Sequence, residues 1–244
     1  MSLPDLIEIM PLAQGPLEVN VTMPGSKSIT NRALILAALA EGEVELTGAL
    51  WSEDTQIMVD ALRALGFRID VNPDAAEASN RIIAVQGLGG RIPNTGTAEA
   101  PLEIFVGNAG TAARFLAAMV CLGDGSVRLH GVDRMHERPQ KELFRALRRL
   151  GYHIDSPNDQ LPAVFHGGGP REASCTVSLN ESSQFATALL QVAPRGKWYV
   201  DLAGANLDEA PYVRMTQEMM AAFPHSGGRF VIEPDASSGS FFWG

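Results

Sequence analysis

The chain has 244 residues, of which 45% are hydrophobic and 19% charged, and its formal net charge at pH 7 is −9. This composition is typical of a globular protein with one large or two small domains, and its acidic balance argues against nucleic-acid binding, which needs basic surface. The longest apolar runs have eight residues, too few to span a membrane, and the first ten residues do not resemble a signal peptide. We therefore expect a cytoplasmic protein without a membrane partner.

The same order of predicted elements occurs three times along the chain. Each copy has an apolar helix, a glycine turn, an alternating strand that ends in glycine, and an amphipathic helix. The apolar helices contain "ALILAALA", "FLAAMVCL" and "FATALLQVA". The strand and the segment with the amphipathic helix of each copy are predicted over 41–48 and 51–71, 123–131 and 133–155, and 194–204 and 207–223. In "LGFRID" and "LGYHID" the first two of these helices end at Gly66 and Gly151 and lead into a strand.

Three copies in the same order indicate an α/β domain with internal pseudo-threefold symmetry. We predict three repeated βαβαββ-like units that begin near residues 22, 104 and 177. The first helix of each unit is apolar on all sides, which is typical of a helix buried at the centre of a domain. The amphipathic helices should lie nearer the outside.

Small polar residues precede the apolar helix of each unit, in "PGSKSITNR", "GNAGTAAR" (107–114) and "NESSQF" (180–185). Equivalent positions in a pseudo-threefold domain share one face, so the N-termini of the three helices should converge. Free N–H groups and positive dipole ends would then point at one place. Helix capping alone explains Ser182 or Thr111. It does not explain Lys27 and Arg32, because cations oppose the helix dipole there, and we predict an anion site.

The starts of the amphipathic helices supply further candidates: Glu53, Asp54, Arg134, Arg138, Tyr212 and Arg214. Ordinary structural roles are open to them, since Pro139 and Pro211 can simply start helices and Arg134 can pair with Asp133. Arg138 is the strongest candidate, because a planar guanidinium matches carboxylate and phosphate groups.

Neither a disulfide framework nor a metal site is predicted. Cys121 and Cys175 form no framework and no metal-ligand spacing, and Cys121 lies in an apolar run where we expect a buried thiol. The five histidines never pair at helical ligand spacing with a third ligand nearby.

The segments "PGSKSITNRAL", "GNAGTAAR", "RMHERP" and "SSQF" together resemble 5-enolpyruvylshikimate-3-phosphate (EPSP) synthases, over residues 20 to 223. The resemblance implies two domains of three units each, which close on substrates in a cleft. It also implies transfer of the enolpyruvyl group of phosphoenolpyruvate to the 5-hydroxyl of shikimate 3-phosphate, through a tetrahedral adduct, with release of phosphate. This is a step of aromatic amino acid biosynthesis that glyphosate blocks, and it uses no metal or organic cofactor.

Motif by motif, the resemblance assigns residues to the two substrates. The residues expected to contact phosphoenolpyruvate are Lys27, which is also the expected catalytic residue, Asn108, Gly110, Arg138 and Gln184. The residues expected to contact shikimate 3-phosphate are Ser28, Arg32, Ser182, Ser183, Gln184 and Tyr212.

The resemblance also divides the chain. Residues 1–20 would belong to the other domain, 21–232 to the N-terminal substrate-binding domain, and 233–244 to a hinge and the start of a second domain, where "PDASSGSFF" resembles a helix start. The acid and base carboxylates of the family lie in that second domain, so we expect this chain alone to be inactive and to need it as a partner. Exposed edges could also support self-association. The third unit, with "AAFPHSGGRFVIE", should lack a strand pair.

Two other functions stay open. The related enolpyruvyl transferase that acts on UDP-N-acetylglucosamine uses a loop cysteine, and neither Cys121 nor Cys175 occupies such a place. A non-catalytic anion-binding module is the alternative from a different class of protein.

Overall fold

The computed structural model describes residues 6, 8, 10, 18–204 and 210–242. Its helices are α1 (Lys27–Leu39), α2 (Glu53–Ala64), α3 (Gly110–Met119), α4 (Asp133–His136), α5 (Lys141–Arg149), α6 (Ser183–Gly196), α7 (Ala210–Ala222) and α8 (Ala236–Gly239), with short 3-10 turns η1 (Val120–Leu122) and η2 (Ser240–Phe242). Its strands are β1 (Glu43–Leu50), β2 (Ile69–Pro73), β3 (Asn80–Gln86), β4 (Leu102–Phe105), β5 (Ser126–His130), β6 (His153–Asp155), β7 (Ala163–His166), β8 (Ala173–Ser178), β9 (Trp198–Ala203) and β10 (Gly228–Val231).

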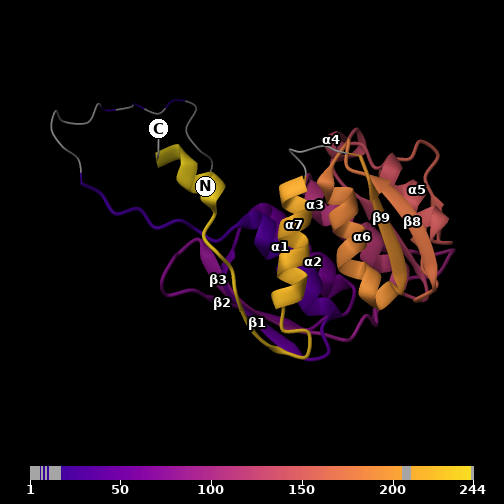
Figure 1. Ribbon diagram of the computed structural model, residues 1–244, viewed down its shortest axis with the longest axis horizontal. Helices are drawn as coiled ribbons and strands as arrows, with labels where there is room; N and C mark the ends of the chain where they lie inside the picture. Colours follow the sequence, from indigo (N-terminus) through magenta and orange to yellow (C-terminus); the bar gives the residue numbers. More distant parts are fainter. Residues whose placement is uncertain (1–5, 7, 9, 11–17, 205–209, 243–244) are drawn as a thin grey trace.

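The helices α1, α3 and α6 contact one another and form the centre of the domain. All residues of α1 from Thr30 to Leu39 are buried, and α3 buries every residue except Thr111. Such helices can only be stable inside a core, because they have no polar face to turn toward water. The predicted central position of the three apolar helices is confirmed, and α7 lies beside α6 (Figure 1).

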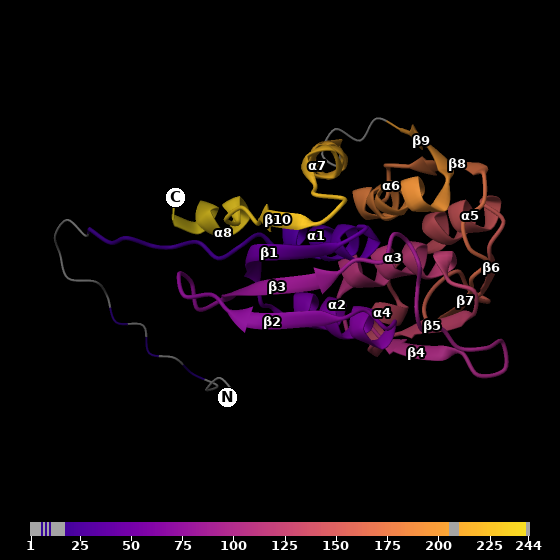
Figure 2. The same cartoon turned by 90° about the horizontal axis from the view of Figure 1, so that it is seen from below.

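Two four-stranded sheets repeat one arrangement. Their strand orders are β10-β1-β3-β2 and β4-β5-β7-β6. In each sheet an edge strand runs parallel to the strand that follows the central helix, and that strand pairs antiparallel with the second strand of a hairpin. Figure 2 shows β1–β3 and β4–β7 in succession along the molecule, which is the predicted internal repeat.

The third sheet contains only β8 and β9, paired parallel. After α7 the chain turns within a few residues and enters β10, which joins the first sheet instead. Within the described residues, the third unit therefore lacks the antiparallel hairpin that the other two units have, as the sequence predicted. Among the described residues, the edge of β9 away from β8 has no strand partner.

Two predicted boundaries were wrong, both at prolines. The segment 133–155 does not begin with one continuous helix, because α4 ends at His136 and α5 begins only at Lys141. Pro139 lies before Gln140, the N-cap of α5, and does not initiate that helix itself. Conversely, α6 continues through Pro194 and ends at Gly196, where Lys197 adopts a left-handed conformation with φ 59°. A proline there removes one backbone N–H donor, and α6 nevertheless continues to Gly196.

The segments before α1 and after β10 lie side by side. Gly25 forms a bridge with Pro234, Ser26 N donates to the Glu233 carbonyl at 2.9 Å, and Asp235 N donates to the Pro24 carbonyl at 2.8 Å. The chain thus enters and leaves the domain at one point, and both segments extend from there to the same side of the molecule (Figure 1).

Candidate functional site

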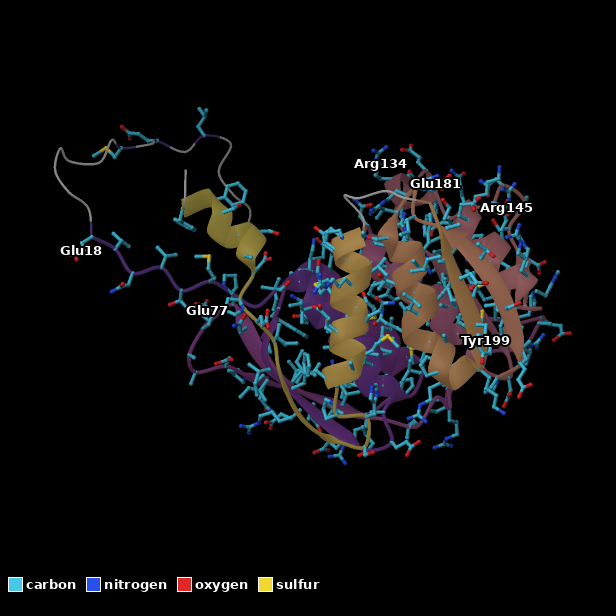
Figure 3. All side chains as sticks on the ribbon, in the orientation of Figure 1. Glu18, Glu77, Arg134, Arg145, Glu181 and Tyr199 are labelled. Carbon is cyan, nitrogen blue, oxygen red and sulfur yellow. The ribbon has the colours of Figure 1, made fainter. Side chains whose placement is uncertain are left out.

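A cavity of about 330 Å³ lies where the three central helices begin. Its lining comes from the first turns of α1, α3 and α6 and from α7: Lys27, Ser28, Arg32, Thr111, Ser182, Ser183, Gln184 and Tyr212. The predicted convergence of the three helix N-termini is therefore confirmed. In Figure 3, Glu181, which immediately precedes the N-cap residue Ser182 of α6, lies at the same end of the molecule as Arg134.

The helix ends carry partial positive charge that the caps do not remove. The Ser182 Oγ accepts from the Gln184 N–H at 3.2 Å, and the Ser26 Oγ accepts from the Ile29 N–H at 3.5 Å. The N-cap of α3, Ala109, has no side chain that can accept. A side chain thus caps two of these helix N-termini. However, the first four N–H groups of each helix have no intrahelical acceptor, and the caps satisfy only some of them. The remaining groups and the aligned dipoles favour an anion in the cavity.

Arg32 is the main charge of the cavity wall. It is 3% exposed, and its guanidinium is held by neutral oxygens: Nε donates to Thr216 Oγ1 at 2.9 Å, Nη1 to the Ser28 carbonyl at 2.9 Å and Nη2 to Thr187 Oγ1 at 3.4 Å. No carboxylate of the described residues forms an ion pair with it. Burial lowers the pKa of Arg32 to about 10, so it remains a cation at neutral pH. A buried cation without a counter-charge is stabilised by an anionic ligand.

Lys27 is the second cation of the cavity, and it has a partner. Its Nζ lies 3.2 Å from Asp54 Oδ2, at the start of α2. The ammonium side chain is half exposed, so the pair is a weak one, and the ammonium can still meet a bound anion. Asp54 thus contacts a cavity residue, Lys27, without lining the cavity itself. Its neighbour Glu53 does not line the cavity either.

Three predicted residues form a separate group beside the cavity. Arg138 Nη1 donates to the Asn108 carbonyl at 2.9 Å. The α-carbon of Gly110 packs so closely against the guanidiniums of Arg138 and Arg114 that a Cβ would collide with both. None of the three predicted residues is in the lining, but Gly110 precedes Thr111, which is. They therefore flank the cavity on its α3 side.

Gln184 has an unusual feature for a side chain at the edge of a cavity. Its Oε1 atom is buried and has no hydrogen-bond partner among the described residues. A buried amide oxygen normally finds a donor. Tyr212, by contrast, is 44% exposed on the far side of the cavity. Both positions suit contacts to a bound polar molecule.

The sequence did not predict the residues that form hydrogen bonds with the Arg32 side chain. It also did not predict a role for Arg114, the residue of α3 that is equivalent to Arg32. Thr187 Oγ1 and Thr216 Oγ1 form a hydrogen bond of 3.2 Å, and both accept hydrogen bonds from the Arg32 guanidinium. No local motif marks these two threonines, because they lie far apart in the chain. Arg114, in "GNAGTAAR", was not singled out. Its Nη1 donates to the Gly110 carbonyl and its Nη2 to the Pro139 carbonyl, both at 3.0 Å. The equivalent positions of "GTAAR" and "SITNR" in the first two units could have indicated that Arg114 is the counterpart of Arg32.

The other candidates lie outside the cavity. Arg134 pairs with Glu137 at 2.6 Å rather than with Asp133, and Arg214 pairs with Glu218 at 2.8 Å. Cys121 and Cys175 are buried, as predicted for Cys121, and burial raises the pKa of both thiols. Within the described residues, no helix is both long enough and apolar enough to cross a bilayer.

Comparison with solved structures places the fold among enolpyruvyl transferases. The EPSP synthase of Acinetobacter baumannii superposes with a TM-score of 0.71 at 24% identity, over 91% of this chain and 51% of that chain. The enolpyruvyl transferase NikO of Streptomyces tendae superposes with a TM-score of 0.54 at 15% identity, over 91% of this chain and 53% of that chain. At these identities the likeness shows the fold alone.

The sequence comparisons then show to which family the chain belongs. Residues 12–226 match the family described as EPSP synthase (3-phosphoshikimate 1-carboxyvinyltransferase), and the chain belongs to that family. A 3-phosphoshikimate 1-carboxyvinyltransferase of Opitutus terrae is 40% identical over 264 aligned positions, covering 99% of this chain and 59% of that protein. The chain thus spans little more than half the length of the curated relatives it matches.

Proposed function

We propose that this cavity is one wall of an EPSP synthase active site and that it binds shikimate 3-phosphate next to phosphoenolpyruvate. The observation that carries the proposal is Arg32, a buried guanidinium without a carboxylate partner among the described residues, which lines a cavity at three converging helix N-termini. Both proposed substrates are anions, and such a wall offers them fixed positive charge and N–H donors.

The two halves of the site suit the two substrates. Ser28, Arg32, Ser182, Ser183, Gln184 and Tyr212 line one continuous surface from α1 across α6 to α7, which we assign to shikimate 3-phosphate. Its hydroxyl and amide groups match a polyhydroxylated ring that carries a phosphate. Lys27 and the group of Asn108, Gly110 and Arg138 lie toward α3, and we assign them to phosphoenolpyruvate, with Gln184 between the substrates.

The reaction we propose is an addition followed by an elimination. The 5-hydroxyl of shikimate 3-phosphate loses its proton and adds to C2 of phosphoenolpyruvate, while C3 gains a proton to become a methyl group. The resulting tetrahedral adduct then expels phosphate as the methyl group gives up a proton, which restores the C2–C3 double bond. Lys27, held by Asp54, is placed to stabilise the phosphate that leaves.

Acid and base groups for these proton transfers must come from elsewhere. No carboxylate and no imidazole is among the residues that line the cavity in the described part of the chain. We therefore propose that a second domain supplies them, that residues 21–232 form the substrate-binding domain, and that 1–20 and 233–244 lead to the other domain. The pairing of Gly25 with Pro234 supports a common crossing point. Much of 1–20, and 243–244, lie outside the described residues.

Exposed apolar side chains support a contact with that second domain or with another copy of the chain. Phe241 is 87% exposed, Phe242 62% and Val231 65%, and all three lie within eight residues of Pro234 in the chain. Apolar groups gathered in this way commonly mark an interface. We propose that the protein works in the cytoplasm, where both phosphorylated substrates would be available.

The absence of acid and base groups from the lining also favours a second function, a non-catalytic anion-binding module. One experiment separates the two. The 244-residue chain and the C-terminal half of a relative are purified apart, and phosphate release from phosphoenolpyruvate is followed with shikimate 3-phosphate present. Activity only in the mixture supports the proposed enzyme. Binding of shikimate 3-phosphate without activity in the mixture supports the binding module, and robust activity of the chain alone contradicts the proposed need for a second domain.

A further inference from the structure

Two histidines and an aspartate gather on the outer face of the second sheet. His153 of β6 is directly opposite His166 of β7 in the antiparallel ladder, and Asp155 is two residues beyond His153. Residues opposite each other in such a pair share one face of the sheet, as do residues two apart in one strand. The three side chains therefore meet although they are up to 13 residues apart in sequence.

The ligand atoms of the three residues converge. His153 Nε2 lies 2.7 Å from Asp155 Oδ1, and His166 Nε2 lies 2.8 Å from Asp155 Oδ2. The two rings stack with centroids 4.9 Å apart, and one ligand atom from each residue lies within 4.8 Å of the others. Two ligands of a tetrahedral ion with bond lengths of roughly 2.0–2.1 Å are about 3.4 Å apart. Small side-chain rotations are enough to reach that spacing.

The buried hydroxyl of Ser126 orients the imidazole of His166 through its Nδ1 atom. Ser126, on β5, is 3% exposed, and its Oγ lies 2.9 Å from His166 Nδ1. A histidine that binds a metal through Nε2 normally donates its Nδ1–H to such a partner. A hydroxyl both donates and accepts, so Ser126 can serve His166 with Asp155 alone and also with a metal bound. This orientation is the feature that distinguishes the cluster from a chance surface ion pair.

We propose that His153, Asp155 and His166 form a binding site for a divalent first-row transition metal ion, with zinc as the representative ion. Two imidazole nitrogens and one carboxylate oxygen are ligands that such ions accept, and the exposed side of the cluster leaves a position for water. The ion would replace the protons on the two Nε2 atoms that now face Asp155. It would link β6 to β7 and stabilise that hairpin.

The metal site is separate from the cavity at the helix N-termini. None of its three residues lines that cavity, and β6 and β7 lie at the end of the molecule opposite α8 (Figure 2). The sequence predicted no metal site because its histidines lack ligand spacing along a helix, whereas this cluster arises from pairing across strands. Ion binding and substrate binding should therefore be independent.

The test is a calorimetric titration of the purified protein with zinc chloride in a buffer without chelators. We expect one ion per chain in the parent protein and at least tenfold weaker binding in both Asp155→Asn and His153→Ala. These side chains are 57% and 73% exposed, so the variants should fold. Ser126→Ala should weaken binding about tenfold through the orientation of His166. His225→Ala, which removes an exposed histidine elsewhere, is the control and should bind like the parent.

X-ray absorption at the zinc edge supplies an independent readout. The proposed site predicts two imidazole ligands and oxygen ligands at roughly 2.0–2.2 Å. The proposal is overturned if no saturation occurs up to about 1 mM zinc, if both variants bind within threefold of the parent, or if the spectrum shows no imidazole.

Discussion

Arg32 of α1 and Arg114 of α3 occupy equivalent positions in the internal repeat. Each is 3% exposed, each donates from Nη1 to the carbonyl four residues earlier, and each guanidinium lies 5.5 Å from the centre of a phenylalanine ring on the next central helix. The rings are Phe115 and Phe185. Of the two, only Arg32 lines the cavity, so one guanidinium faces the cavity while its counterpart bonds to the carbonyls of Gly110 and Pro139 beside it.

Replacement of Arg32 should separate stability from binding. Burial lowers the folded-state pKa of Arg32 to about 10, so at neutral pH the buried charge lowers the free energy of unfolding. The unfolded chain holds this proton more tightly, so the penalty is complete below pH 10 and declines as the pH rises above it. Arg32→Met should therefore be at least as stable as the parent in urea unfolding.

The same Arg32→Met variant should bind shikimate 3-phosphate at least tenfold more weakly, because a hydrogen bond to a charged group contributes about 1.5–3 kcal/mol. Arg114→Met is the matched control, since it is equally buried but does not line the cavity. It should keep its affinity for shikimate 3-phosphate within about threefold. Equal losses in both variants would mean that Arg32 acts only through the fold.

Gly110→Ala should move Arg138. The new methyl group would collide with the guanidiniums of Arg138 and Arg114, and the partly exposed Arg138 has more freedom to shift. We expect weaker binding of phosphoenolpyruvate with shikimate 3-phosphate binding unchanged, measured by ligand titration of each substrate. Unchanged binding of both would contradict the assignment of this group to phosphoenolpyruvate.

Asp54→Asn should strengthen the binding of a simple anion. Asp54 neutralises Lys27 at 3.2 Å, so its removal raises the positive potential at the cavity. A pair this exposed is worth about 0.2–1 kcal/mol, and we expect inorganic phosphate to bind about two- to fivefold more tightly at low salt. Asp60→Asn, on the same helix but paired with Arg63, is the control. A weaker affinity in Asp54→Asn would show that Asp54 mainly orients Lys27.

The open edge of β9 should be visible in amide hydrogen exchange. Strands β1 and β5 have partners on both sides, whereas β9 pairs only with β8 in the part of the chain that the structure describes. Alternate β9 amides therefore face the open edge and should exchange much faster than those of β1 and β5. The side chain of Tyr199, 81% exposed, points outward from the same strand (Figure 3). Uniformly slow exchange in β9 would show that this edge is covered in solution.

The repeat, the central helices and their converging N-termini were predictable because they depend on local patterns. Apolar residues on all sides marked α1, α3 and α6, and glycines marked the ends of the strands. Lys27 and Arg32 were informative because their charges contradict the helix dipole beside them. The comparisons confirm the family to which these motifs pointed.

Contacts between distant segments were not predictable in the same way. The pairing of β10 with β1 joins residues 184 positions apart, and neither strand's sequence indicates it. Thr187 and Thr216 look like ordinary helix residues until the fold brings them to Arg32. His153 and His166 meet only because of the register of β6 and β7.

The most direct test of the central claim is an NMR titration of the 244-residue chain with shikimate 3-phosphate. Two or three charge-assisted contacts, worth about 4 kcal/mol together, correspond to a dissociation constant on the order of 1 mM. We predict saturable shifts at Ser28, Ser182 and Gln184 that disappear in Arg32→Ala. If no shift occurs at these residues up to about 10 mM, even with a second domain added, the cavity is not the shikimate 3-phosphate site.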